Sequence, residues 1–314
     1  MDQPAIAVTV MMATHNGAST LPRVLEAYRL LIAPPGGWRL VAVDNASTDT
    51  TLDLLWELAG NLPMIPLRIE RQGKNAALNA GLAHTAGELI VFTDDDVLPD
   101  RDWLVALSQA ALQSPEYDVF AGTIYPVWPK PPPDWILRLV NLGATYAITP
   151  ASLTSGPVAS GLVWGANMAI RRRILAAGYR FNEAVGPQAG EYAMGSEVDL
   201  VSRLEKAGHR ALFVPQARVG HLIRPHQLER EWIVRRAFRL GRHMYHRESE
   251  GYPAGTKLIR GAPRWQYRRL LNAYLASLAG RLRGDFDTRL RADWDVSYLR
   301  GYLLEAHRTR MTRP

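Results

Sequence analysis

The sequence contains no cysteine, and it lacks the long apolar runs of membrane proteins. Without thiols it can form neither disulfides nor thiolate metal sites, and thiol usage does not indicate a compartment. No window reaches the roughly 18 uninterrupted apolar residues that a membrane span requires. The start, Met1 to Pro4, carries no basic segment, so we expect no signal peptide. These absences predict a cytoplasmic protein that is soluble or peripheral at the inner face of a membrane.

Two glycine-rich nucleotide-binding motifs are also missing. No Gly-x-Gly-x-x-Gly follows the first predicted strand, and no Walker-type loop ending in Gly-Lys-Ser or Gly-Lys-Thr occurs. The dinucleotide-binding and P-loop classes therefore lose their main support. If the protein binds a nucleotide, carboxylates and a metal ion have to hold it in place of a glycine-rich loop.

The formal net charge of +7 is unevenly distributed along the 314 residues. Arginine dominates from Arg218 onward, and helical patterns there span roughly 228–245, 265–283 and 294–308. We therefore predict a basic helical C-terminal region over 226–314. A basic surface suggests an anionic neighbour. No nucleic-acid-binding motif accompanies the charge, so we expect no nucleic acid partner.

Aromatic side chains stand among these arginines, at Trp232, Phe238, Tyr245, Trp265 and Tyr267. Basic helical faces with aromatic residues can lie on anionic membranes. Peripheral membrane contact through this region is one hypothesis. The alternative is that the arginines solvate helices that pack on the rest of the chain or on a second subunit of a homo-oligomer.

Strands and helices alternate over the first hundred residues. Apolar, strand-like runs at 5–12, 38–43, 67–70 and 89–93 are separated by helical segments. This order predicts an α/β fold with a mostly parallel central sheet flanked by helices. Ligands of such open sheets bind at the carboxyl ends of the strands. The polar loops at those ends should therefore meet at one edge, and they are Thr14–Gly17, Asp44–Asp49, Gln72–Asn75 and Asp94–Asp96.

Three adjacent carboxylates, Asp94, Asp95 and Asp96, follow the apolar run Leu89–Phe92. Like charges at this spacing repel one another, and folding does not require them. A divalent cation with an anionic ligand accounts for them, because Mg²⁺ and Mn²⁺ prefer oxygen ligands and often also hold substrate phosphates. The alternative is a charged turn after the strand.

Six short motifs occur in order along the chain, and they are Ala13–Asn16, Val43–Asp49, Gly73–Gly81, Phe92–Pro99, Gly165–Met168 and Gly195–Leu200. Together they resemble the inverting glycosyltransferases of family 2, which have the Rossmann-like GT-A fold. The resemblance covers roughly residues 5–225. It implies a GT-A catalytic domain over 1–225, with a nucleotide-binding half at about 1–98 and an acceptor-side half at about 99–225.

The resemblance implies a nucleotide-diphosphate sugar as the donor and Mn²⁺ or Mg²⁺ as the cofactor. It assigns Asp44 to the nucleobase and Asp94 to the ribose or the sugar, and carboxylates can accept hydrogen bonds from ring N–H groups and ribose hydroxyls. Asp96, the last acid of an Asp-x-Asp motif, would bind the metal. The other residues of the implied nucleotide-sugar pocket are Thr14, Asn16, Lys74 and Asp95. For Asp95, holding the turn is the alternative role.

An inverting transfer needs a base on the face opposite the leaving diphosphate, to take the proton of the acceptor hydroxyl. The resemblance places this base at Glu197, where the family more often has aspartate. Asp199 is a candidate for the acceptor side. The alternative for Asp199 is structural, because Ser196 and Asp199 fit a helix capping box and acids are favoured in a first helical turn.

Three further candidates lie in the second half of the resemblance. Trp164 and Asn167 belong to the acceptor side, at the motif Gly165–Met168. His221 follows the last predicted strand, where the resemblance often shows a histidine near the metal or the diphosphate. Imidazole is an adequate ligand for Mn²⁺, so His221 is the second candidate metal ligand.

The sequence therefore predicts an inverting, metal-dependent glycosyltransferase. Its acceptor would be a hydroxyl of a sugar, a lipid-linked molecule or another compound, in the synthesis of a polysaccharide, a glycolipid or another glycoconjugate. A nucleotidyltransferase on a similar fold is one alternative, but Thr14–Gly17 is not the glycine- and arginine-rich loop that this class requires. A non-catalytic nucleotide-sugar-binding protein is the other, and it would not need Asp94, Asp96 and Glu197 together.

Overall fold

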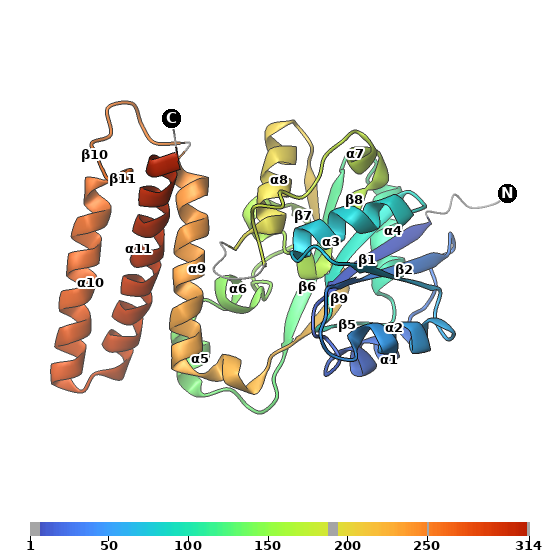
Figure 1. Ribbon diagram of the computed structural model, residues 1–314, viewed down its shortest axis with the longest axis horizontal. Coiled ribbons are helices and arrows are strands. Elements are labelled where there is room, and N and C mark those ends of the chain that lie inside the picture. The colour runs from blue at the N-terminus through green and yellow to red at the C-terminus, as the bar shows by residue number, and fades with distance from the viewer. Residues whose placement is uncertain (1–6, 188–193, 250, 313–314) are drawn as a thin grey trace. The chain divides into compact units, whose positions relative to one another are not determined.

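The computed structural model describes residues 7–187, 194–249 and 251–312. The chain forms two compact units, which Figure 1 shows with the chain coloured from its N-terminus to its C-terminus. Within the described residues, the sheet unit comprises 7–127, 146–187 and 196–222, and the helical unit comprises 128–145, 194–195, 223–249 and 251–312. The first two residues of the strand predicted at 5–12 lie outside the described part, as do Met1 to Pro4.

The sheet unit contains a mixed sheet in which most paired residues lie in parallel ladders. The strands follow the order β3-β2-β1-β4-β8-β6-β9-β5, and β7 also pairs with β9. They are β1 (Val8–Thr14), β2 (Trp38–Asn45), β3 (Met64–Ile69), β4 (Leu89–Asp94), β5 (Val97–Pro99), β6 (Val119–Val127), β7 (Gly156–Pro157), β8 (Met168–Arg171) and β9 (Ala211–Leu222). The ladders β3-β2-β1-β4 and β6-β9 are parallel, whereas β8 runs antiparallel to β4 and β6. The predicted α/β class with a mostly parallel sheet is confirmed.

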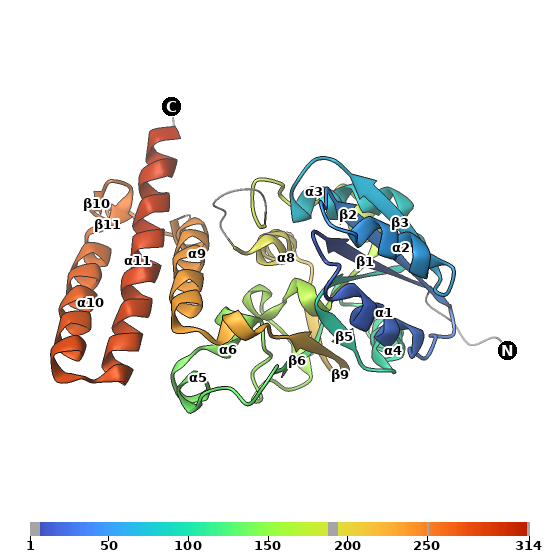
Figure 2. The same ribbon diagram turned by 60° about the horizontal axis from the view of Figure 1, so that its bottom comes forward.

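Helices cover both faces of this sheet (Figure 2). On one face, α3 (Lys74–Gly81), α7 (Arg172–Ala176) and α8 (Ser196–Lys206) pack on a core that includes Phe92 of β4. On the other face, α1 (Leu21–Arg29) and α4 (Trp103–Gln113) meet where the rings of Tyr28 and Trp103 contact edge to face at 6.2 Å. α2 (Thr51–Ala59) packs beside α1. Full burial of a large apolar side chain contributes roughly 1.5–3 kcal/mol, so these layers hold the strand ends in place.

The helical unit is a layer of three long helices, α9 (Arg230–Ser249), α10 (Arg264–Arg283) and α11 (Phe286–Thr312), with α11 between the other two in both views (Figures 1 and 2). α9 and α11 cross closely at two glycines. A Cβ atom on Gly241 would come within 1.9 Å of the carbonyl oxygen of Tyr298, and one on Gly301 within 2.0 Å of that of Phe238. Neither helix could therefore carry a larger residue at the crossing without moving apart.

The remaining short elements complete both units. They are α5 (Asp134–Leu139), α6 (Leu142–Tyr146), the hairpin β10 (Leu258–Ile259) and β11 (Ala262–Pro263), and the 3₁₀ turns Leu82–His84, Ser160–Leu162, Gly165–Asn167 and Pro225–Leu228. α5 belongs to the helical unit, where Arg138 binds Asp287 of α11 at 2.7 Å. No helix in the described ranges is both long enough and apolar enough to span a membrane.

Candidate active site

The polar loops at the carboxyl ends of β1 and β2 are joined to the loops that follow them in the sequence. In the register of the sheet, Thr14 at the end of β1 lies beside Asp44 of β2. The hydroxyl of Thr14 donates to Asp95 Oδ2 at 2.5 Å, and the backbone N–H of Gly73 donates to Asn45 Oδ1 at 2.8 Å. The four predicted loops therefore meet at one edge of the sheet. The contact with Thr14 also ties Asp95 to the end of β1.

Lys74 links two carboxylates from distant parts of the chain. Its ammonium group donates to Asp94 Oδ1 at 2.6 Å and to Glu197 Oε1 at 2.8 Å. The side chains of Lys74 and Glu197 are only 18% and 16% exposed. Burial lowers the pKa of Lys74, but the two adjacent carboxylates outweigh burial and raise the pKa well above its ordinary value. Lys74 therefore remains positively charged throughout the physiological range.

Glu197 occupies a space that a glycine leaves open. It is the second residue of α8, and a Cβ atom on Gly165 would come within 2.3 Å of Glu197 Oε1. Any other residue at position 165 would displace this carboxylate or the backbone beside it. Trp164, directly before the glycine, is partly exposed. The two acceptor-side motifs of the sequence therefore lie against each other at Glu197.

Asp96 and His221 are brought together by the pairing of β5 with β9. Val97 lies opposite His221 in this antiparallel ladder, and the backbone N–H of Leu222 donates to the carbonyl of Asp96 at 2.8 Å. His221 Nε2 lies 3.5 Å from Asp96 Oδ1, and both side chains are largely buried. His221 Nδ1 lies 2.7 Å from the backbone carbonyl oxygen of Tyr146. Since a carbonyl oxygen can only accept, Nδ1 is the donor and Nε2 faces the Asp96 carboxylate. Burial lowers the pKa of His221, but the Asp96 carboxylate raises the pKa by more than burial lowers it, so the net shift is upward.

This pair fits a divalent cation of the Mn²⁺ or Mg²⁺ type. A carboxylate oxygen and an imidazole nitrogen are suitable ligands for Mn²⁺, and the hydrogen bond from Nδ1 to a carbonyl is the orienting contact that metal-bound histidines usually make. The described residues contain no group of three or more histidine or acidic side chains placed to hold a metal ion. Asp96 and His221 would therefore supply two ligands, and oxygens of a bound diphosphate and water would have to complete the coordination.

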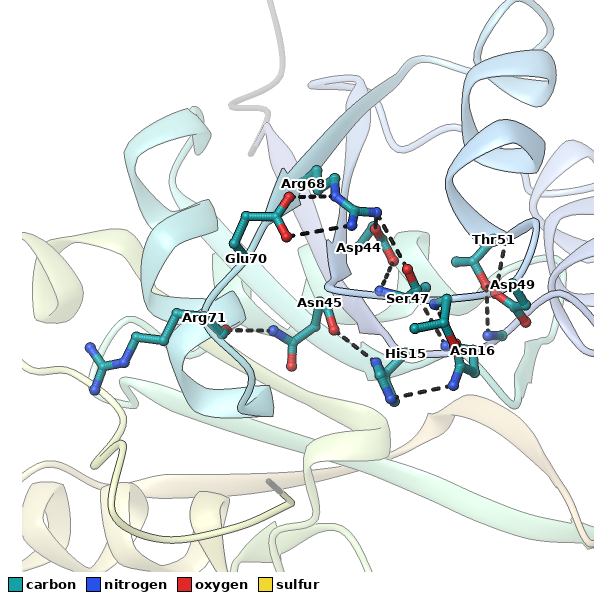
Figure 3. Close-up of polar contacts among 12 residues, drawn as sticks. His15, Asn16, Asp44, Asn45, Ser47, Asp49, Thr51, Arg68, Glu70 and Arg71 are labelled. Carbon is teal, nitrogen blue, oxygen red and sulfur yellow. Dashed lines mark hydrogen bonds and ion pairs between the residues drawn. The ribbon is translucent and has the colours of Figure 1, made fainter. Parts of the chain in front are cut away.

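Asp44 is completely buried, and both of its oxygens accept hydrogen bonds (Figure 3). Arg68 Nη1 of β3 donates to Asp44 Oδ2 at 2.8 Å, and the backbone N–H of Ser47 donates to Oδ1 at 3.2 Å. Arg68 also binds Glu70 at 2.7 Å. Asn16 joins the same network, because its backbone N–H donates to Ser47 Oγ at 2.9 Å. Asn16 and Asp44 thus lie in one hydrogen-bonded network at the carboxyl ends of β1, β2 and β3.

The sequence model of the family described as "Glycosyl transferase family 2" matches residues 9–177. The chain belongs to this family. Glycosyltransferase AglE of Haloferax volcanii is 22% identical over 242 residues, which cover 75% of this chain and 72% of AglE. The glucosyl-dolichyl phosphate glucuronosyltransferase of the same organism is 22% identical over 177 residues, which cover 54% of this chain and 54% of that protein.

A solved glycosyltransferase structure has a fold similar to that of this chain. The mannosyltransferase PcManGT from Pyrobaculum calidifontis, determined in complex with GDP-mannose and Mn²⁺, aligns with a TM-score of 0.62 and 21% identity. The alignment covers 98% of this chain and 87% of that one. The predicted GT-A fold with a helical C-terminal extension is confirmed, and so is the prediction of a glycosyltransferase.

Two of the predicted acceptor-side residues, Asn167 and Asp199, contact helices and strands of the sheet unit. Asn167 is 1% exposed, and its side chain accepts from Trp103 Nε1 at 2.8 Å and donates to the carbonyls of Thr123 and Ala217 at 3.0 and 2.8 Å. These contacts tie α4, β6 and β9 together. Asp199 is bound by Arg203 one turn along α8 at 3.0 Å, which is a different contact from the capping box with Ser196.

Arg68 was missed from the sequence, although it touches the buried Asp44. One sequence feature indicated it, because Arg68 is a charged residue in a short apolar strand. In the structure it lies opposite Asp44 in the ladder of β2 and β3. The carbonyl of Tyr146 was missed as well. A backbone group carries no side-chain signature, so only the folded chain reveals it.

Proposed function

We propose that this glycosyltransferase transfers a sugar from a nucleotide-diphosphate sugar to an acceptor hydroxyl with inversion of configuration, and that it requires Mn²⁺ or Mg²⁺. The observation that carries the proposal is the position of Lys74 between Asp94 and Glu197. Asp94 belongs to the strand end at which the donor is expected, and Glu197 to the helix expected on the acceptor side. Their common contact with Lys74 supports a candidate base close to the proposed donor site.

Glu197 would act as the general base. The acceptor oxygen attacks the anomeric carbon while the bond from that carbon to the diphosphate oxygen breaks, and the electron pair leaves with the diphosphate. The proton of the acceptor hydroxyl goes to a carboxylate oxygen of Glu197. The ammonium of Lys74 favours the ionised form of that carboxylate, because an adjacent positive charge stabilises a negative one. Lys74 and Thr14 would also line the nucleotide pocket.

Asp96 and His221 would hold the metal ion, and Asp94 would contact the ribose or the sugar. When bound, the ion supplies positive charge that stabilises the departing diphosphate. The Mn²⁺ in the complex of PcManGT supports a divalent cation in this protein, by similarity of fold alone. Asp44, held by Arg68, would meet the nucleobase together with Asn16. Asp95 would support the pocket through Thr14.

The acceptor is proposed to be a hydroxyl on a sugar or a lipid-linked sugar, in the synthesis of a polysaccharide, a glycolipid or another glycoconjugate. The name of the Haloferax glucuronosyltransferase includes glucosyl-dolichyl phosphate, which supports a lipid-linked acceptor as one such class. Trp164, partly exposed beside Gly165, would contact the acceptor, and Asn167 would keep this segment in place.

A thermal-shift screen tests the donor half of the proposal. Nucleoside diphosphates and nucleotide sugars with different bases are compared with and without Mn²⁺, since a ligand that binds the folded state raises the unfolding temperature. We expect one base to give the largest shift and the shift to require the metal. Absence of any metal-dependent shift contradicts the proposal. NMR of the product of the best donor then determines whether the anomeric configuration is inverted.

A further inference from the structure

The outward face of α10 carries large apolar side chains. Leu271, Leu275, Leu278 and Leu282 recur at intervals of four, three and four residues, so they lie on one side of the helix. Their exposed fractions range from 54% to 80%. Tyr274, at the edge of this stripe, is also exposed. We call this set of five residues the leucine face.

The buried residues of α10, on the side that packs on α11, are small or polar, and the larger Tyr267 is only partly buried. The buried residues are Gln266, Ala273, Ser277 and Gly280. Ser277 Oγ donates to Asp293 of α11 at 2.5 Å, and a Cβ atom on Gly280 would come within 2.8 Å of the backbone nitrogen of Arg289. A helix at the edge of a water-exposed layer normally turns its large apolar residues inward. In α10 this distribution is reversed, so the leucine face is placed to contact something outside the helical unit.

The charged residues of α10 itself all have one sign. α10 contains five arginines and no acidic residue, and all five are exposed, at positions Arg264, Arg268, Arg269, Arg281 and Arg283. The hairpin before α10 adds Leu258 and Ile259, which are exposed between Lys257 and Arg260. Arg281 also faces Asp293 of α11 at 3.9 Å, but on α10 itself only cations accompany the apolar stripe. Such a stripe complements a surface that is apolar inside and anionic outside.

We propose that α10 lies on an anionic membrane surface, with the leucine face in the acyl region and the arginines at the lipid headgroups. Amphipathic helices bind membranes in this way, and arginine side chains can extend along the apolar layer to reach the phosphates. Anionic lipids attract each basic residue near the surface. Pairing of two α10 helices would instead place rows of arginines against each other without acids between them, which disfavours self-association. The proposal is independent of the transfer reaction, because it concerns a surface of the helical unit.

Vesicle co-sedimentation of the full chain tests the proposal. The probes are phosphatidylcholine vesicles and vesicles in which part of this lipid is replaced by phosphatidylglycerol. We expect binding to the anionic vesicles only, and weaker binding at high salt because the headgroup attraction is screened. The double variant Leu275→Gln/Leu278→Gln should bind at least about tenfold more weakly, since two apolar side chains no longer enter the lipid. The variant Arg268→Glu/Arg283→Glu should lose the preference for anionic lipid.

Matched controls separate the surface from general effects. Leu30→Gln and Leu112→Gln remove exposed leucines from the sheet unit, and these variants should bind vesicles as the unchanged protein does. Circular dichroism should be the same for all variants, because every substituted side chain is exposed. Binding that is absent in the unchanged protein, or equal in the leucine variants, overturns the proposal. Self-association in the absence of lipid that disappears in Leu275→Gln/Leu278→Gln also overturns it, and assigns the face to a second copy of the chain.

Discussion

Lys74 Nζ lies 2.8 Å from Glu197 Oε1, although the two residues are 123 positions apart in the sequence. The contact joins the first residue of α3 to the first turn of α8. Lys74 also binds Asp94. One ammonium group therefore contacts a carboxylate of the proposed donor side and a carboxylate of the proposed acceptor side. The roles of Lys74 and Glu197 can be separated by substitutions that remove charge with little change in size.

Glu197→Gln should abolish transfer while leaving donor binding intact. The amide is isosteric but cannot accept the proton of the acceptor hydroxyl, so we expect the transfer rate to fall by about 10²–10⁴-fold. Rates are measured with saturating donor, and nucleoside diphosphate affinity is measured by calorimetry. Asp199→Asn is the matched control two residues along α8, and it should retain most activity. Near-normal turnover in Glu197→Gln would mean that another group is the base.

Lys74→Met should shift the pH dependence of transfer. Without the ammonium, Glu197 loses a neighbouring positive charge, so protonation of this proposed base becomes easier. The acidic limb of the kcat/KM profile should therefore move to higher pH, and the folded state should lose about 1–3 kcal/mol because buried charges lose a partner. Lys130→Met, at an exposed lysine, should change neither quantity. An unshifted acidic limb would show that Lys74 does not influence the base.

Asp96→Asn and His221→Gln should each weaken Mn²⁺ binding, measured by electron paramagnetic resonance in the presence of a nucleoside diphosphate. Each change removes one of two proposed protein ligands, and we expect a loss of roughly tenfold or more. Removal of metal with EDTA should abolish transfer in the unchanged protein, and added Mn²⁺ should restore it. His84→Gln replaces an exposed histidine and should bind Mn²⁺ normally. Equal Mn²⁺ affinity in all variants would place the metal elsewhere.

Glu305 should make the helical unit sensitive to acid. Burial raises the pKa of Glu305. Hydrogen bonds with His246 at 2.9 Å and Arg242 at 2.6 Å lower the pKa by more than burial raises it, to about 2. A carboxylate whose pKa is lower in the folded state stabilises the fold at pH values above its unfolded pKa, and this contribution is lost as the pH falls through the folded pKa. We therefore expect about 3 kcal/mol of unfolding free energy to disappear between about pH 4.5 and 2.

Urea unfolding at several pH values measures this contribution. Glu305→Gln should be less stable than the unchanged protein at pH 7, and the difference should shrink as the pH falls toward 2. Glu205→Gln, at an exposed position on α8, should follow the unchanged protein at every pH. A difference between Glu305→Gln and the unchanged protein that stays constant with pH would exclude the ionisation of Glu305 as its cause.

Local pattern was sufficient to predict the strands and the loops of the donor side. The runs that become β1 and β4 are largely apolar because both faces are covered, and polar residues follow where the strands leave the core. The partners of those polar residues were less predictable. Asp96 meets His221 because β5 and β9 pair antiparallel, and Asp44 meets Arg68 because β2 and β3 are in a particular register. Such pairings depend on the whole sheet, so spacing along the chain does not reveal them.

The sequence by itself determined the family, the order of elements and which carboxylates end the strands, since these depend on residues close together in the chain. Tertiary structure alone decided that Lys74 contacts Glu197, because that contact requires two helices to begin at the same place. It also decided the orientation of α10. Helical periodicity predicts that Leu271, Leu275, Leu278 and Leu282 share one face, and the usual rule would bury that face. Packing against α11 uses the small residues instead, because only they allow the close approach of the two helices.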